Sequence, residues 1–248
     1  METIIFDVDD TLYDQARSFH QTFRKMFEGS FTDKEIDQIY RVSRKHSEIL
    51  FDQSEAGEIT QFEWQTGRII KACNEFNIPI DIEKAEAFHH LYVEEQQKII
   101  LFDEIEELLE ALHKEGTQLA ILTNGEEKHQ EKKIEQLKLT KWIPAENIFI
   151  SGTHGYAKPK REIFEIMEEK LGLDKTKTVY IGDSFEKDII GAKQVGWQAI
   201  WMNHRKRALP ENPVFKPDHE VQHAKELLGL FRDRGTGSSS HSYVSHSN

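Results

Sequence analysis

The chain has 248 residues, with 32 lysines and arginines against 44 aspartates and glutamates, which gives a net charge of −12. This acidic balance excludes a sequence-independent binder of nucleic acid, which needs a cationic face, and no apolar run approaches the roughly 18 residues of a membrane span. The single cysteine, Cys73, excludes a disulfide framework and a cysteine-based zinc site. We therefore expect a reducing, cytoplasmic setting and a buried structural thiol.

The first 100 residues contain one strand followed only by helices. The apolar run TIIFDV at 3–8 predicts a buried strand. Residues 15–99 then show phenylalanines at a spacing of four, two capping-box starts and a fourth helical pattern near 83–98. The phenylalanines are Phe19, Phe23 and Phe27, and the helix starts lie at Thr32 and Thr60. We expect an all-helical subdomain inserted after the first strand.

The rest of the chain alternates strand and helix. Short apolar runs at 118–122, 147–151, 178–182 and 198–202 are typical of parallel strands covered on both faces. Helical patterns occupy 103–116, 160–173 and 187–196. This alternation predicts an α/β fold with a doubly wound, parallel, Rossmann-like sheet.

These patterns predict three parts. A catalytic core is expected over 1–14 and 100–232, the helical insert over 15–99, and a disordered tail over 233–248. The tail prediction rests on the closing sequence, GTGSSSHSYVSHSN, which is rich in serine and glycine and has no periodicity.

Polar residues follow each strand that should line a binding site. Ligands of open parallel sheets bind at the carboxyl ends of the strands. The residues at these ends are Asp7, Asp9, Thr123, Asn124, Lys158, Asp183 and Asp188. Crowded carboxylates repel each other, so we expect a hard divalent cation among them.

Two lysines close in sequence are separated by Pro159. The residue before a proline is driven out of the α region, so Lys158 should be extended and free to reach the site. Lys160 should begin the next helix and face water. The sequence therefore favours Lys158 as the functional lysine.

Other site types do not fit the pattern. An EF-hand beginning at Asp7 would need glycine at Leu12 and glutamate at Ser18. The chain also lacks the P-loop, dinucleotide-binding, G-x-S-x-G and H-E-x-x-H motifs. The basic run His204-Arg205-Lys206-Arg207 favours a solvated loop, with contact to a substrate phosphate or a partner surface as the alternatives.

Four segments together resemble the motifs of the haloacid dehalogenase (HAD) superfamily. They are DVDDT from Asp7, LTNG from Leu122, AKP from Ala157, and GDS from Gly182 with Asp188 following. The resemblance covers about residues 3 to 230, and the helical insert resembles the superfamily's C1 cap. One departure is Lys187, where many relatives have asparagine.

The resemblance implies a role for each motif residue. Asp7 would be the nucleophile that takes a phosphoryl group, and Asp9 would be the general acid and then the general base. Thr123, Asn124 and Lys158 would hold phosphoryl oxygens. Mg²⁺ would be bound by Asp7, by Asp9 through its carbonyl, and by Asp183, with Asp188 as a further ligand or as an orienter of Lys158.

Asp9 favours a phosphatase over a dehalogenase. An alkoxide leaving group needs a proton donor, whereas halide does not, and the superfamily's dehalogenases lack an aspartate at this position. We expect Mg²⁺-dependent hydrolysis of a small phosphorylated metabolite. The motif sequences resemble most closely those of the nucleoside 5′-monophosphate phosphatases. The alternatives are a phosphosugar mutase and a non-catalytic phosphate-binding module. No nucleic-acid or membrane partner is expected, and the chain should be a monomer or homodimer.

Overall fold

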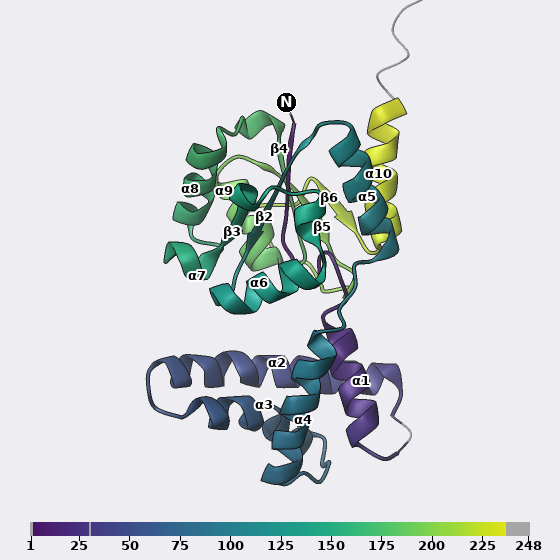
Figure 1. The fold of residues 1–248 in the computed structure, drawn as a ribbon, viewed down its shortest axis with the longest axis vertical. Coiled ribbons are helices and arrows are strands. Elements are labelled where there is room, and N and C mark those ends of the chain that lie inside the picture. Colours follow the sequence, from purple (N-terminus) through teal and green to yellow (C-terminus); the bar gives the residue numbers. More distant parts are fainter. Residues whose placement is uncertain (1, 30, 237–248) are drawn as a thin grey trace, which may run out of the picture. The chain divides into compact units, whose positions relative to one another are not determined.

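The structure, a computed structural model, describes residues 2–29 and 31–236. They form two compact units, one of residues 2–14 and 100–236 and the other of residues 15–29 and 31–99 (Figure 1). No helix in the described ranges is both long and apolar enough to span a membrane.

The first unit is built on one parallel sheet of six strands in the order β3-β2-β1-β4-β5-β6. The strands are β1 (Thr3–Phe6), β2 (Gln118–Thr123), β3 (Ile148–Ile150), β4 (Thr178–Gly182), β5 (Gln198–Met202) and β6 (His219–Val221). The predicted doubly wound α/β fold is confirmed. The short edge strand β6 was not predicted, because its three residues, of which two are exposed, carry no apolar pattern.

Helices cover both faces of this sheet (Figure 1). They are α5 (Asp103–Lys114), α6 (Glu127–Gln136), α7 (Ser151–His154), α8 (Arg161–Leu171), α9 (Ile190–Gln194) and α10 (Ala224–Thr236). Three 3₁₀ turns, η1 (Leu139–Lys141), η2 (Ala145–Asn147) and η3 (Lys175–Lys177), and a π-helical turn, η4 (Phe185–Ile189), complete the connections.

The strand side chains alternate between the two faces. On one face, Ile5 and Tyr180 pack with Phe164 of α8, Ile189 of η4 and Trp197. On the other side of the sheet, α5 and α10 lie next to each other (Figure 1). Burial of both faces explains why the strands are continuous apolar runs rather than alternating ones.

Helix α10 extends into the segment that was predicted to be a disordered tail. Helix α10 continues through Thr236, so residues 233–236, which were assigned to the disordered tail, are helical. The apolar residues that hold α10, Leu227 and Leu228, lie in its first half, and the polar end gave no periodic signal. Residues 237–248 lie outside the described residues.

In the described residues of the second unit every regular element is a helix, as predicted. They are α1 (Ala16–Met26), α2 (Asp33–Glu55), α3 (Gln61–Glu75) and α4 (Ile82–Gln96). Both capping boxes are present, at Thr32 with Glu35 and at Thr60 with Glu63.

The phenylalanines of α1, together with Phe27 directly after it, lie in the core of this unit. Phe19, Phe23 and Phe27 pack against residues of the other three helices, including Phe88 of α4. Cys73 is fully buried there, and burial raises the pKa of its thiol to about 12. This thiol is structural, as predicted.

Candidate active site

Asp7 and Asp9 follow the carboxyl end of β1, which lies between β2 and β4. The backbone N–H of Asp7 donates to the carbonyl of Ile181 at 2.9 Å and extends the strand pairing by one residue. The chain then turns at Asp10, which has a φ of 55°. This turn begins where the parallel strands end, the edge at which ligands of such sheets bind.

Lys158 joins two of these carboxylates. Its Nζ donates to Asp7 Oδ1 at 2.8 Å, to Asp188 Oδ1 at 2.6 Å and to the hydroxyl of Tyr180 at 2.8 Å. Burial alone would lower the pKa of Lys158, but Asp188 and Asp7 outweigh that effect and hold it above its ordinary value. The lysine is therefore a fixed positive charge, whereas Lys160 is exposed.

Asn124 holds the backbone of Lys158. Its Oδ1 accepts from the N–H of Lys158 at 2.8 Å, and its Nδ2 donates to the Lys158 carbonyl at 2.9 Å. The neighbouring Thr123, at the end of β2, has a buried hydroxyl with no hydrogen-bond partner among the described residues. Buried orphan donors are rare, so this hydroxyl is suited to a ligand oxygen.

Asp188 reaches the end of β4 because Gly182 leaves space for it. A Cβ on Gly182 would lie 2.4 Å from the Asp188 carboxylate. The Oδ2 of Asp188 accepts from the backbone N–H of Ser184 at 2.9 Å. The π-helical turn η4 therefore aims this side chain back at the strand end.

Asp7, Asp183 and Asp188 form a cluster able to hold a metal ion. One oxygen from each lies within 4.8 Å of the others. Burial, opposed by Lys158, raises the pKa of Asp7 to about 6, and burial together with Asp188 raises the pKa of Asp183 well above its ordinary value. Three crowded carboxylates offer hard oxygen donors, and the repulsion among them would be relieved by a divalent cation such as Mg²⁺.

The side chain of Asp9 lies in a different environment. Lys133 Nζ donates to both of its oxygens at 2.7 Å, Gln130 Nε2 donates to Oδ2 at 3.0 Å, and the Tyr13 hydroxyl donates to Oδ1. Burial would raise the pKa of Asp9, but Lys133 lowers it to about 2. Asp9 is an ionised carboxylate here, and its backbone carbonyl as a metal ligand stays a prediction.

Two arginines of the basic run pair with aspartates. Arg207 Nη1 lies 2.9 Å from Asp183 Oδ2, and Arg205 Nη2 donates to Asp10 Oδ1 at 2.8 Å and also to Asp14. The preference for a solvated loop is therefore wrong for Arg205, which is half-buried, whereas Lys206 and Arg207 are exposed. Sequence spacing could not predict the contact between Arg205 and Asp10, because the two residues are 195 positions apart.

Sequence reasoning also missed α6, which supplies Gln130 and Lys133. This helix is strongly polar, and Ile134 is its one buried apolar residue. The signal that could have found it is Glu126, which caps the helix by accepting from the N–H groups of Lys128 and His129. A buried lysine in such a helix is informative, since lysine is rarely buried without a partner.

Comparisons with known proteins agree with this geometry. A family model described as haloacid dehalogenase-like hydrolase matches residues 1–196. The HAD-hydrolase YfnB of Bacillus subtilis is 28% identical over 240 residues, 94% of this chain and 97% of that protein. A crystal structure of YfnB bound to magnesium has a TM-score of 0.66 at 27% identity and covers 92% of this chain and 97% of that one.

Relatives with different reactions also match. The N-acylneuraminate-9-phosphatase of Mus musculus is 28% identical over 243 residues, 94% of each chain. The haloacetate dehalogenase H-2 of Moraxella sp. is 27% identical over 207 residues, 82% of this chain and 86% of that one. Overall similarity therefore leaves the reaction to be argued from individual residues.

Proposed function

Since the chain belongs to the haloacid dehalogenase-like hydrolase family, we propose that it hydrolyses a small phosphomonoester, with Asp7 as the nucleophile. The observation that carries this proposal is the cluster of Asp7, Asp183 and Asp188, in which Lys158 pairs with Asp7 and Asp188, together with the orphan hydroxyl of Thr123. The magnesium-bound relative and the phosphatase relative support it.

We propose Mg²⁺ as the metal, held by Asp7, Asp183 and Asp188. When bound, it would neutralise the repulsion between a phosphate dianion and the attacking carboxylate. Arg207 pairs with Asp183 and fixes that carboxylate in place.

The reaction would proceed in two displacements. A carboxylate oxygen of Asp7 forms a bond to phosphorus as the ester oxygen leaves, and water then attacks the phosphorus and releases Asp7. Lys158 and the hydroxyl of Thr123 would stabilise charge on the phosphoryl oxygens. Asn124 would act by holding the backbone of Lys158, through the two hydrogen bonds described above.

Asp9 would exchange protons in both steps. With a pKa of about 2 beside Lys133, it is in the basic form that the second step needs, when water gives up a proton. In the first step the departing alkoxide needs a proton. We propose that Asp9 turns away from Lys133 and takes up a proton from solvent, and that it donates this proton to the ester oxygen as the P–O bond breaks. Asp9 is also the residue that favours phosphatase over dehalogenase chemistry.

A phosphate-release screen tests the function. Nucleoside 5′-monophosphates, sugar phosphates and other small monoesters would be incubated with the wild type and with Asp7→Asn, with and without Mg²⁺. We expect Mg²⁺-dependent release by the wild type alone, because the amide of the variant cannot form the acyl phosphate. Halide release from 2-haloacids without phosphate release would refute the proposal, and isomerised phosphosugar without free phosphate would indicate a mutase. The preference for nucleoside monophosphates stays a prediction.

A further inference from the structure

All three hydrogens of the Lys158 ammonium group are used inside the protein. Its Nζ donates to Asp7 Oδ1 at 2.8 Å, to Asp188 Oδ1 at 2.6 Å and to the hydroxyl of Tyr180 at 2.8 Å. An ammonium group has three N–H donors. A phosphoryl oxygen that binds Lys158, as the proposed function requires, therefore replaces one of these partners.

The hydroxyl of Tyr180 is also bound on a second side. Its one hydrogen has two acceptors in range, and the carbonyl oxygen of Leu122, at 2.8 Å, is nearer than Asp188 Oδ1, at 3.2 Å. Leu122 belongs to β2, which is separated from the strand of Tyr180, β4, by β1. The hydroxyl therefore connects the ammonium group of Lys158 to the backbone of β2.

Close aromatic packing holds the ring of Tyr180. Its centroid lies 5.9 Å from that of Phe164 and 6.4 Å from that of Trp197, and all three side chains are fully buried in the same core. Side chains in a close-packed interior occupy defined rotamers. The core therefore keeps the Tyr180 hydroxyl in one place.

Lys158 is attached at both of its ends to residues that flank Thr123. Asn124 binds the backbone N–H and the carbonyl of Lys158, and Leu122 holds the ammonium group through Tyr180. The buried hydroxyl of Thr123 lies between these two attachments in the chain. Three consecutive residues at the end of β2 therefore set the spacing between the two donors proposed to meet phosphoryl oxygens.

Asp7 is the partner of Lys158 best suited to be exchanged. Asp188 is held independently of the lysine, because its Oδ2 accepts from the N–H of Ser184 at 2.9 Å. The Tyr180 hydroxyl is held by β2 and by the core around its ring. Asp7, in contrast, is the proposed nucleophile, and one of its oxygens would form a bond to phosphorus.

We propose that Tyr180 is a positioning residue for the reaction. Its hydroxyl anchors the ammonium group of Lys158 to β2, so the hydrogen now given to Asp7 can pass to a phosphoryl oxygen while the other two stay in place. A donor fixed in advance stabilises developing charge without reorganising during the reaction. This inference rests on the proposed function and adds to it a residue outside the four motifs.

The anchor is tested without turnover, by NMR on the full chain with ¹⁵N-labelled lysine. Buried, hydrogen-bonded hydrogens exchange slowly with water, so Lys158 Nζ should give a slowly exchanging resonance that is absent from Lys158→Ala. Tyr180→Phe should speed this exchange at least about tenfold, because one bond to a charged group is lost. The exchange of Lys133, which is also buried, should not change.

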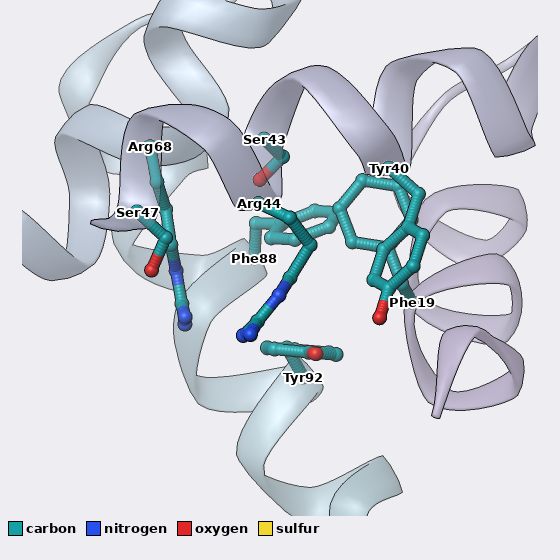
Figure 2. Close-up of a pocket in the computed structure, with 8 residues that line it drawn as sticks. All are labelled: Phe19, Tyr40, Ser43, Arg44, Ser47, Arg68, Phe88 and Tyr92. Carbon is teal, nitrogen blue, oxygen red and sulfur yellow. The ribbon is translucent and has the colours of Figure 1, made fainter. Parts of the chain in front are cut away.

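Tyr40→Phe is the matched control for this measurement. It makes the same chemical change at a buried tyrosine of the helical unit, whose hydroxyl donates to Gln15 Oε1 at 3.2 Å and whose ring lies 5.3 Å from that of Phe19 (Figure 2). It should leave the exchange of Lys158 as in the wild type.

Two results would show that the hydroxyl is not an anchor. One is a wild-type Lys158 resonance that exchanges as quickly as those of exposed lysines. The other is an exchange rate in Tyr180→Phe equal to that of the wild type. If Tyr180→Phe fails to fold, a nuclear Overhauser effect in the wild type, between the Tyr180 hydroxyl hydrogen and the Lys158 ammonium group, tests the same contact, and its absence overturns the proposal.

Kinetics separates positioning from a purely structural role. In Tyr180→Phe, kcat should fall about tenfold or more while KM changes less than about threefold, because the contact matters most as charge develops on the phosphoryl oxygens. Thr178→Val should keep both values. It removes another buried hydroxyl of β4, which donates to the Asp174 carbonyl at 2.7 Å, away from the site.

A double-mutant cycle completes the test. Because Tyr180 acts through Lys158, Tyr180→Phe should cause almost no further loss of kcat in the Lys158→Ala background. Losses that add in full would make the role of Tyr180 structural and overturn the proposal. If no phosphomonoester is hydrolysed but Tyr180→Phe speeds the exchange of Lys158, the proposed function fails while the anchoring contact stands. If hydrolysis is found and Tyr180→Phe has wild-type kcat, the positioning role alone is wrong.

Discussion

At the scale of single residues, burial and the neighbouring lysine together decide the protonation of each carboxylate. Asp7 and Asp9 are two positions apart and both mostly enclosed, yet the pKa of Asp7 is raised to about 6 and that of Asp9 is lowered to about 2. Lys158 is shared between Asp7 and Asp188, whereas Lys133 gives both of its short contacts to Asp9. Separated pKa values suit two carboxylates with different tasks.

The two lysines on either side of Pro159 should differ in catalysis. Lys158→Ala should cost about 2 to 4 kcal/mol of transition-state stabilisation, the scale of one preorganised electrostatic contact. Lys160→Ala should be near neutral, because Lys160 is exposed. The measurement is kcat/KM on the best substrate of the screen, with urea unfolding to correct for stability. The opposite order would show that Lys160 is the functional lysine.

Asp9→Asn should distinguish substrates by their leaving group. An alkoxide depends on a donated proton, whereas nitrophenolate, with a pKa near ~7, leaves with little help. Single-turnover formation of the phosphoenzyme should therefore slow far more on an alkyl phosphate than on nitrophenyl phosphate. Its later hydrolysis should also slow, so the phosphoenzyme should accumulate. An equal loss on both substrates in the first step would remove Asp9 from the role of leaving-group acid.

At the scale of elements, close packing next to the site depends on two glycines, which have no side chain. In α9 the chain passes Phe164 of α8 at Gly191, where a Cβ would lie 2.3 Å from the ring. Gly182 likewise leaves space for the carboxylate of Asp188. The segment that carries Asp188 can therefore lie directly against the sheet and against α8.

Gly191→Ala should destabilise the protein by about 1 to 3 kcal/mol, because the added methyl overpacks the core against Phe164. The matched control is Gly229→Ala in α10, where nothing lies within 4 Å of an added Cβ. That change should stabilise by up to about 1 kcal/mol through helix propensity. Urea unfolding of both variants measures the two effects. A neutral Gly191→Ala would mean that α8 and α9 can separate at little cost.

At the scale of the whole molecule, stability should depend on pH through the carboxylate cluster. The chain carries a net charge of −12, and Asp7, Asp183 and Asp188 lie close together within it. A carboxyl whose folded pKa lies above its unfolded value of 3.8 contributes stability at low pH that is lost as pH rises through the folded value. For Asp7 that loss is complete above about 6.

Mg²⁺ should therefore stabilise the protein more at about pH 7.5 than at about pH 5. At the higher pH the cluster is ionised and binds the cation, whereas at the lower pH a proton on Asp7 competes with it. Thermal melts with and without Mg²⁺ at both values measure this. Asp183→Asn should lose most of the Mg²⁺ effect, while Asp9→Asn, whose carboxylate lies outside the cluster, should keep it. An equal rise in melting temperature at both pH values would contradict the raised pKa of Asp7.

The sequence alone determined the elements whose signals are local. Apolar runs predicted five strands of the sheet, and the capping boxes at Thr32 and Thr60 predicted the starts of α2 and α3. The order of strands and helices then limited the sheet to a parallel one with its ligands at the strand ends. The carboxylates and Lys158 were identified in this way because each follows a strand closely in the chain.

Only the tertiary structure decided what surrounds those carboxylates. Lys133 meets Asp9 across 124 positions and Arg205 meets Asp10 across 195. Burial is what makes such charges matter, and burial follows from packing rather than from local pattern. Residue types and spacing fix which groups are available, and the fold fixes which of them share a desolvated space.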